Sequence, residues 1–142
     1  MKIVILGCGR VGATLATQLE DAGHIVSVID KSGDSFYRLS PKFKGDKIIG
    51  NGVDEEVLRR AGIEDADAFA AVTNGDNRNI MASQIAKEIF HTPKVICRIY
   101  DSLREQTFRE LGLETICPTQ IITDLVSDAL IGKKPPALSN KS

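Results

Sequence analysis

The chain has 142 residues, a formal net charge of −1 and 42% hydrophobic residues, values typical of one globular domain. This length allows a substantial buried core but leaves no room for a nucleotide-binding unit together with a separate catalytic domain. The near-zero net charge argues against a nucleic-acid-binding protein and against electrostatic attachment to an anionic membrane.

The sequence carries no recognisable targeting segment or disulfide framework. Met1-Lys2 leads into an apolar run of about five residues, which is too short for a signal peptide or a membrane span, and no later run is long enough. Cys8, Cys97 and Cys117 are widely spaced and form no CxxC pair, so we expect reduced thiols and no zinc site. These features favour a cytosolic protein.

The first predicted strand, residues 3–6, runs directly into Gly7-Cys8-Gly9-Arg10-Val11-Gly12. A helix is expected next, followed by a second strand at residues 25–29 that ends on Asp30. One apolar stripe is expected on the helix, formed by Val11, Leu15, Leu19 and Ala22. In a nucleotide-binding βαβ unit, Gly7 allows the tight turn, Gly9 lets the backbone approach a pyrophosphate, and Gly12 lets the helix pack closely on the sheet. A glycine turn without a ligand is the alternative.

Asp30 and Arg10 indicate the kind of ligand. The Asp30 carboxylate would accept hydrogen bonds from ribose hydroxyls and repel a 2′-phosphate, which favours NAD or an adenine nucleotide over NADP. Alternatively, Asp30 only caps the turn Lys31-Ser32-Gly33. A cation such as Arg10 in a first helical turn costs on the order of 0.3–1 kcal/mol unless an anion is present, which indicates a phosphate. The alternative is an Arg10 side chain that extends into solvent.

Cys8 lies in the same loop, at the start of the predicted helix. A thiolate would be stabilised there by the helix N-terminus. A small residue that fills space in the loop is the favoured interpretation.

Strands and helices continue to alternate along the rest of the chain. Four more strands are predicted, at residues 47–49, 68–72, 95–99 and 114–116. Helices are expected to begin at Asp54, Asp76, Asp101 and Pro118. Large apolar residues are expected to face inward on two of these helices, namely Ile80, Met81, Ile85 and Ile89 on one and Leu103, Phe108 and Leu111 on the other. The pattern predicts an α/β fold: a single Rossmann-like, doubly wound, parallel six-stranded sheet of order 3-2-1-4-5-6 with a C-terminal amphipathic helix.

In such a sheet a ligand lies at the carboxyl ends of the strands, where the strand order reverses. The residues that follow the five strands concerned are polar or glycine: Gly7 to Arg10, Asp30 and Lys31, Gly50-Asn51-Gly52, Thr73-Asn74-Gly75-Asp76, and Arg98 or Tyr100. Loops of any α/β sheet are polar. For each residue beyond the first two loops, contact with a ligand and an ordinary loop role are therefore equally weighted alternatives.

Nothing in the sequence points to catalysis. A dehydrogenase needs a proton donor or acceptor beside the nicotinamide and a pocket for its second substrate. The sequence shows no Ser/His/Asp set, metal-ligand cluster or pair of carboxylates near the predicted crevice. We therefore expect a protein without catalytic or metal-binding residues, in which a bound nucleotide acts as a signal. The alternative is the coenzyme-binding domain of an NAD-dependent oxidoreductase, cut from a longer chain.

Several segments together carry a family resemblance: residues 3–12, 28–31, 50–58, 61–68, 72–76 with Asn79, and 97–98. They resemble the KTN/RCK N-terminal domain (TrkA-N), the regulatory domain of Trk/Ktr-type potassium uptake systems. The resemblance implies a homo-oligomeric regulatory subunit that binds NAD(H), ATP/ADP or AMP, while the charge of Asp30 disfavours NADP. It also implies that the subunit gates a membrane potassium transporter or channel and lies in the cytoplasm, peripheral to the inner face of the cell membrane.

The same resemblance implies roles for single residues. The first loop would contact phosphates, with Arg10 also reaching towards a partner subunit's nucleotide, and Arg98 would stand near the phosphates. Asp30 and Lys31 would hold the adenosine ribose, while Asn51, Thr73 and Asn74 would border the adenine or a second nucleoside. The full set of predicted contact residues is Gly7, Gly9, Arg10, Val11, Gly12, Asp30, Lys31, Asn51, Gly52, Thr73, Asn74 and Arg98.

The chain departs from the family pattern in two places. The family commonly has Gly-Asp-Ala where this chain has Gly50-Asn51-Gly52, which removes a carboxylate from that contact. The family often continues into a small C-terminal ligand domain, so these residues are expected to be either the N-terminal half of a longer subunit or a naturally short one.

The C-terminal part of the sequence is expected to form a helix and a tail. The helix has a broad apolar face made of Ile121, Ile122, Leu125, Val126, Ala129 and Leu130. This face would either close the chain's own sheet or cross to a second subunit. We expect a nucleotide-binding domain over residues 1–130 and a tail or linker over residues 131–142.

Overall fold

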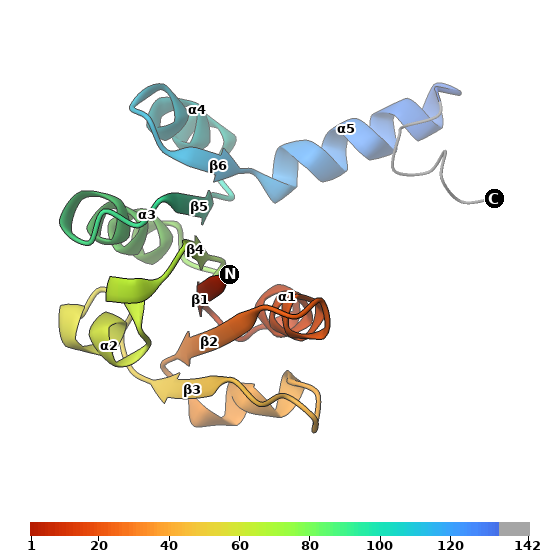
Figure 1. Ribbon diagram of the computed structural model, residues 1–142. Coiled ribbons are helices and arrows are strands. Elements are labelled where there is room, and N and C mark those ends of the chain that lie inside the picture. Colours follow the sequence, from red (N-terminus) through yellow and green to blue (C-terminus); the bar gives the residue numbers. More distant parts are fainter. Residues whose placement is uncertain (134–142) are drawn as a thin grey trace.

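The computed structural model describes residues 1–133, which form a six-stranded sheet with helices on both faces (Figure 1). All five strand pairs are parallel, in the order β3-β2-β1-β4-β5-β6. The strands are β1 (Lys2–Leu6), β2 (Ile25–Asp30), β3 (Asp46–Ile49), β4 (Ala68–Ala71), β5 (Lys94–Arg98) and β6 (Glu114–Ile116). The predicted fold class and strand order are therefore confirmed. Most of the predicted tail, residues 134–142, lies outside the described residues.

Helical segments connect the strands, and the last of them follows β6. They are α1 (Arg10–Asp21), η1 (Gly33–Arg38), α2 (Glu55–Arg60), η2 (Ile63–Asp65), α3 (Asp76–Gln84), η3 (Ile85–Ile89), α4 (Ser102–Glu110) and α5 (Pro118–Leu130). Asp54 and Asp101 begin α2 and α4 by accepting backbone hydrogen bonds from Glu56 and Leu103, as expected for aspartate N-caps. The short 3₁₀ helices η1 and η2 were not predicted. The predicted helix from Asp76 does reach Ile89, but its last five residues form the π-helical turn η3.

Two hydrophobic cores lie on opposite faces of the sheet. Side chains alternate along a strand, so in β1 Val4 and Leu6 join one core, which includes residues of α2 and α3. Ile3 and Ile5 join the other core, beneath α1. Figure 1 shows α1 on one side of the sheet, with α2 and α3 on the other. The sheet is therefore covered on both faces around β1, the strand that leads into the glycine-rich loop.

Several large side chains that were expected to be buried are exposed. Met81 and Leu103 are 54% and 74% exposed, and Ile89 and Leu111 are also largely exposed. Helix α3 buries small or polar residues instead, namely Asn79, Ala82 and Ser83 beside Ile80. Similarly, α1 buries Gly12, Ala13 and Ala16, whereas Val11 is exposed. Small side chains let a helix lie close to a sheet, so the large residues flank the contact rather than filling it.

Helix α5 extends away from the sheet (Figure 1), and none of its residues is buried. Of the two alternatives for its apolar face, closure of the chain's own sheet is therefore not found within the described residues. Its apolar face remains uncovered, with Ile122, Val126 and Leu130 exposed. Across residues 1–133, no helix combines the length and the apolar character that a membrane crossing requires.

Candidate functional site

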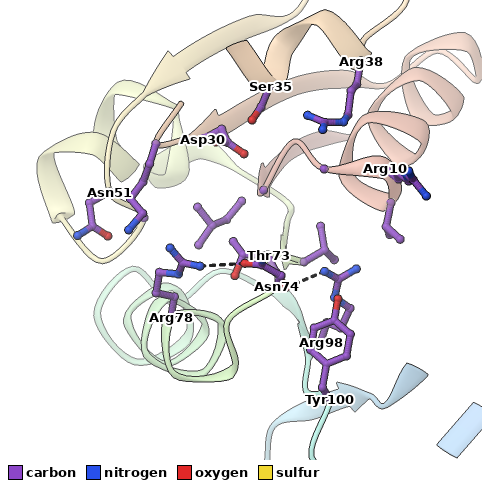
Figure 2. A pocket seen from close by; sticks show the side chains of 17 residues that line it. Arg10, Asp30, Ser35, Arg38, Asn51, Thr73, Asn74, Arg78, Arg98 and Tyr100 are labelled. Atoms are coloured by element: carbon purple, nitrogen blue, oxygen red, sulfur yellow. Dashed lines mark hydrogen bonds between the residues drawn. The ribbon is translucent and has the colours of Figure 1, made fainter. Parts of the chain in front are cut away.

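A cavity of about 470 Å³ lies at the carboxyl ends of the strands (Figure 2). The loops that follow β1, β2, β3, β4 and β5 each contribute to it, for example through Gly9, Asp30, Asn51, Thr73 and Tyr100. All of the predicted contact residues line this cavity except Gly12. The carboxyl edge of the parallel sheet thus brings together residues that are far apart in the sequence. We refer to this cavity as the cleft.

The three motif glycines have different surroundings. Gly7 has a φ of 109°, and a Cβ there would lie 2.9 Å from the backbone nitrogen of Thr73. A Cβ on Gly12 would overlap the carbonyl oxygen of Gly7. Nothing lies within 4 Å of the position that a Cβ would take on Gly9. Gly7 and Gly12 are therefore required by the fold, whereas Gly9 borders open space in the cleft.

Asp30 ties the loops after β1 and β2 together. Its Oδ2 accepts a hydrogen bond of 2.8 Å from the backbone N–H of Cys8, and its Oδ1 accepts one of 2.9 Å from Ser32. The turn cap that was considered as an alternative role is thus present. Each carboxylate oxygen has a second lone pair, so the cap leaves Asp30 able to accept further hydrogen bonds from a ligand.

The Cys8 side chain is fully buried. Burial, followed by the neighbouring Asp30, raises the pKa of this thiol to about 11. The favoured interpretation of Cys8 as a space-filling residue agrees with this environment, because a thiolate is disfavoured despite the adjacent helix N-terminus.

A fully buried asparagine, Asn79, positions the far wall of the cleft. Its Oδ1 accepts hydrogen bonds from the backbone N–H and the hydroxyl of Thr73, at 3.0 and 2.6 Å. Its Nδ2 donates to the carbonyl oxygens of Thr73 and Arg98, both at 2.9 Å. Asn79 therefore joins the loop after β4 to the end of β5, and it holds Thr73 and Arg98 without lining the cleft itself.

Positive charge dominates the cleft. Five cationic side chains line it, and Asp30 is its one acid; the cations are Arg10, Lys31, Arg38, Arg78 and Arg98. None of the five forms an ion pair within residues 1–133. Such a concentration of unpaired cations is the electrostatic environment that binds an anion.

Arg38 and Arg78 were missed by the sequence analysis, as was Ser35. Arg38 and Ser35 belong to the unpredicted 3₁₀ helix η1, which brings them to the cleft. Arg78 lies in the first turn of α3. The reasoning on helix dipoles that singled out Arg10 applies equally to this position, and would have identified Arg78.

Arg98 has the least common environment of the five. Its side chain is only 9% exposed, and its Nη2 donates a 2.7 Å hydrogen bond to the carbonyl oxygen of Thr73. Its Nε is buried without a hydrogen-bond partner among the described residues. Burial lowers the pKa of the guanidinium from its ordinary value. Buried charges in proteins are usually paired, so an anion bound in the cleft would stabilise the Arg98 guanidinium.

A second, larger cavity adjoins the cleft. It has a volume of about 850 Å³ and lies between α1 and the uncovered face of β4, β5 and β6. Apolar residues such as Leu15, Phe69 and Ile116 line it, and Pro118, the first residue of α5, stands at its edge. The residues shared with the cleft are Arg10, Val11, Val72, Arg98 and Tyr100. We refer to this second cavity as the apolar groove.

Residues 1–133 contain no group of three or more His, Cys, Asp or Glu side chains that would hold a metal ion. The three cysteines are free and buried.

Comparison with known proteins gives a consistent result. Residues 3–119 match the family model of the TrkA-N domain. The chain is 48% identical over 124 residues to the Trk system potassium uptake protein TrkA of Streptomyces coelicolor, covering 87% of this chain and 56% of that protein. It is 34% identical over 133 residues to the TrkA protein of Vibrio alginolyticus, covering 89% of this chain and 29% of that protein. The chain thus spans about half or less of the length of these relatives.

Solved structures share the fold at low sequence identity. The Kef C-terminal domain of Shewanella denitrificans in its AMP-bound form has a TM-score of 0.76 and 18% identity, covering 94% of this chain and 83% of that chain. GsuK bound to ADP has a TM-score of 0.76 and 21% identity, covering 91% of this chain and 33% of that chain. The GsuK channel bound to NAD has a TM-score of 0.76 and 20% identity, covering 92% of this chain and 23% of that chain.

Proposed function

The chain belongs to the TrkA-N domain family, and from that premise we propose that it is a nucleotide-sensing regulatory domain of a potassium transport system. In this proposal it binds an adenine nucleotide in the cleft, performs no catalysis, and gates a membrane potassium transporter or channel by a change in subunit arrangement. The names of the relatives, which are potassium uptake proteins, support the transport role.

The observation that carries the proposal is the unpaired positive charge of the cleft. Arg98 is buried and partly unsatisfied, and Arg10 stands at the N-terminus of α1, where the helix dipole adds positive potential. Backbone N–H groups at a helix N-terminus and an open Gly9 are the usual means of binding a pyrophosphate. A phosphorylated ligand would supply the negative charge that the described residues lack.

Asp30 supports a nucleoside rather than a simple polyphosphate as the ligand. Its carboxylate lies at the carboxyl end of β2, the position that accepts ribose hydroxyls in dinucleotide-binding folds. The same negative charge disfavours a 2′-phosphate, and hence NADP. Neighbours of the same fold are described with AMP, ADP and NAD, so we propose NAD(H) or ATP/ADP as the ligand here. The five cations favour the more highly charged ATP and ADP.

An oxidoreductase coenzyme domain remains the second candidate. It is supported by the Rossmann-like order of the sheet, which such enzymes share. Against it, the relatives are named as potassium uptake proteins. The described cleft lining also includes no histidine, cysteine or glutamate, so Asp30, Lys31 and Tyr100 are its main groups able to move a proton. We therefore propose that the bound nucleotide is a signal.

We further propose that the protein works as a homo-oligomer in which α5 of one copy covers the apolar groove of another. The chain's own α5 departs from the edge of the groove at Pro118 and leaves its apolar face uncovered. The groove is lined mainly by apolar side chains and lies over strands that no helix within residues 1–133 covers on that face. A second copy supplies a helix of matching character, and the exchange is reciprocal in a two-fold dimer.

The proposed oligomer would act in the cytoplasm, at the inner face of the cell membrane, through its transporter partner. Because a ligand shifts two arrangements only by its difference in affinity for them, the bound nucleotide must favour one arrangement. Residues shared by the cleft and the apolar groove, such as Arg98 and Tyr100, are suited to transmit that difference.

The test is a calorimetric comparison of ATP, ADP, NADH, NAD and NADPH on the wild type and on Arg10→Ala. We expect binding of ATP or ADP without turnover, weaker binding to Arg10→Ala, and weak binding of NADPH. Arg60→Ala, an exposed α2 residue away from the cleft, is the matched control. Absence of binding by all five nucleotides would overturn the proposal, and oxidation of NADH with a second substrate would favour the oxidoreductase.

A further inference from the structure

Arg78 is a cleft residue to which neither the glycine-rich motif nor the predicted site assigns a role. It projects from the first turn of α3 into the cleft, and in Figure 2 it lies on the same side as Asn51, across the cleft from Arg10. Its side chain is half-buried and forms no ion pair within residues 1–133. A guanidinium in this position is available to a ligand.

The loop after β4 holds one edge of the Arg78 guanidinium. Nη2 donates a 3.0 Å hydrogen bond to Oδ1 of Asn74, drawn as a dashed line in Figure 2. Nη2 and Nε lie 2.9 and 3.0 Å from the position that a Cβ would take on Gly75, and Cζ lies farther away, at 3.3 Å. Because both nitrogens are closer than the carbon between them, the guanidinium turns its edge to the loop.

These contacts use an edge of the guanidinium and not its flat faces. A planar cation with one edge fixed has lost much of the conformational freedom that an exposed arginine keeps. Gly75 contributes by having no side chain, since any Cβ there would displace Nη2 and Nε. Arg78 is therefore prepared for a planar ligand group rather than held by a protein carboxylate.

The proposed function defines which ligand group reaches Arg78. If Asp30 holds the ribose and the N-terminus of α1 holds the phosphates, the base must extend from the ribose away from α1. Asn51 and Arg78 lie on that side of the cleft. We propose, resting on the proposed function, that Arg78 stacks its guanidinium on the purine base of the bound nucleotide, with Asn74 and Gly75 as the positioning residues.

The test separates contact with the base from contact with phosphate. ADP, adenosine and tripolyphosphate are titrated by calorimetry into the full chain as wild type, Arg78→Ala, Arg78→Lys and Gly75→Ala, with Arg60→Ala as the matched control. Gly75 has an extended backbone conformation that alanine adopts freely, with φ −117° and ψ 113°. Gly75→Ala is thus expected to fold while displacing the guanidinium without removing its charge.

We expect Arg78→Ala to lower the affinities for ADP and adenosine by about tenfold, the size of a stacking interaction on a base. The affinity for tripolyphosphate should stay within about twofold of the wild-type value. Arg78→Lys should resemble Arg78→Ala, because an ammonium cannot stack, and Gly75→Ala should show a smaller loss of the same kind. Equal losses for ADP and tripolyphosphate, or unchanged ADP affinity in Arg78→Ala, would overturn the base-stacking role while leaving the proposed function intact. Failure of the wild type to bind ADP and adenosine would overturn both.

Discussion

The guanidinium carbon of Arg98 lies 4.8 Å from the centre of the Tyr100 ring, and both side chains line the cleft as well as the apolar groove. Cation–π contact of this kind partly compensates a buried cation for lost hydration. No carboxylate among the described residues pairs with Arg98. The two residues therefore separate the cleft from the apolar groove. An anion in the cleft would stabilise the charge of Arg98 further.

This environment predicts opposite effects of Arg98→Leu on stability and on binding. Removing an unpaired buried charge should leave the free energy of unfolding within about 1 kcal/mol of the wild type or raise it. Thr73 keeps one hydrogen bond to its carbonyl, from Asn79. The affinity for ADP should fall by about tenfold or more. Urea unfolding and calorimetry check both expectations; strong destabilisation with unchanged ADP affinity would make Arg98 a purely structural residue.

The Asp30 carboxylate should control discrimination between NADH and NADPH. Asp30→Ala removes the negative charge that repels a 2′-phosphate, but it also leaves the N–H groups of Cys8 and Ser32 without their acceptor. Absolute affinity therefore mixes a ligand effect with a loop effect, whereas the ratio of the NADH and NADPH affinities isolates the ribose contact. We expect this ratio to fall by about tenfold in Asp30→Ala. A ratio unchanged by the substitution would remove Asp30 from the ribose site.

Gly9 and Gly12 should respond differently to alanine. Gly12→Ala places a Cβ against the carbonyl oxygen of Gly7, so we expect α1 to be pushed from β1 and the protein to lose about 2 kcal/mol or more of stability. Gly9→Ala meets no atom within 4 Å and should unfold like the wild type, yet bind ADP more weakly because its Cβ narrows the phosphate site. Denaturant titrations and calorimetry of the two variants provide the comparison; equal stability losses would contradict it.

The proposed dimer depends on the apolar face of α5. Val126→Asp places a charge in the middle of that face, where Val126 is 52% exposed, and should shift the protein to monomers because the charge would be buried on association. Ser127→Asp, on the polar side of the same helix with Asp124 and Asp128, is the matched control and should leave the assembly unchanged. Analytical ultracentrifugation distinguishes the two. Dimers of unchanged stability in Val126→Asp would exclude α5 from the interface.

Cys8 should make the protein less stable in alkaline solution. Burial and Asp30 raise the pKa of its thiol from 9.0 to about 11, so between these values the unfolded chain loses a proton that the native chain keeps. The native state then binds more protons, and stability falls as the pH rises through this range. Burial raises the pKa of Cys97 as well, in the same direction. Denaturant titrations between pH 9 and about 11 should show a smaller decline in the free energy of unfolding for Cys8→Ala than for the wild type. An identical dependence on pH in the two proteins would contradict a raised pKa of the Cys8 thiol.

Local sequence patterns were sufficient for the elements and for most of the cleft. Apolar runs and aspartate caps predicted the six strands and the helices between them, because these elements depend on neighbouring residues. The order of the sheet followed from the doubly wound arrangement that such an alternation of strands and helices adopts. The rule that ligands bind at the carboxyl edge then predicted residues such as Asp30, Thr73 and Arg98 as lining the site. These residues do line one cavity; their contact with a nucleotide stays a prediction.

The sequence by itself determined the architecture and the glycine-rich turn between β1 and α1, whose contact with a phosphate stays a prediction. Tertiary structure alone decided which helix faces are covered, as in the exposure of Met81 and Leu103, and brought Arg38 and Arg78 to the cleft. It also left α5 with no buried residue in the described part of the chain. The physical reason is that periodicity describes one helix or strand at a time, whereas burial and charge pairing depend on segments that meet only in the folded chain.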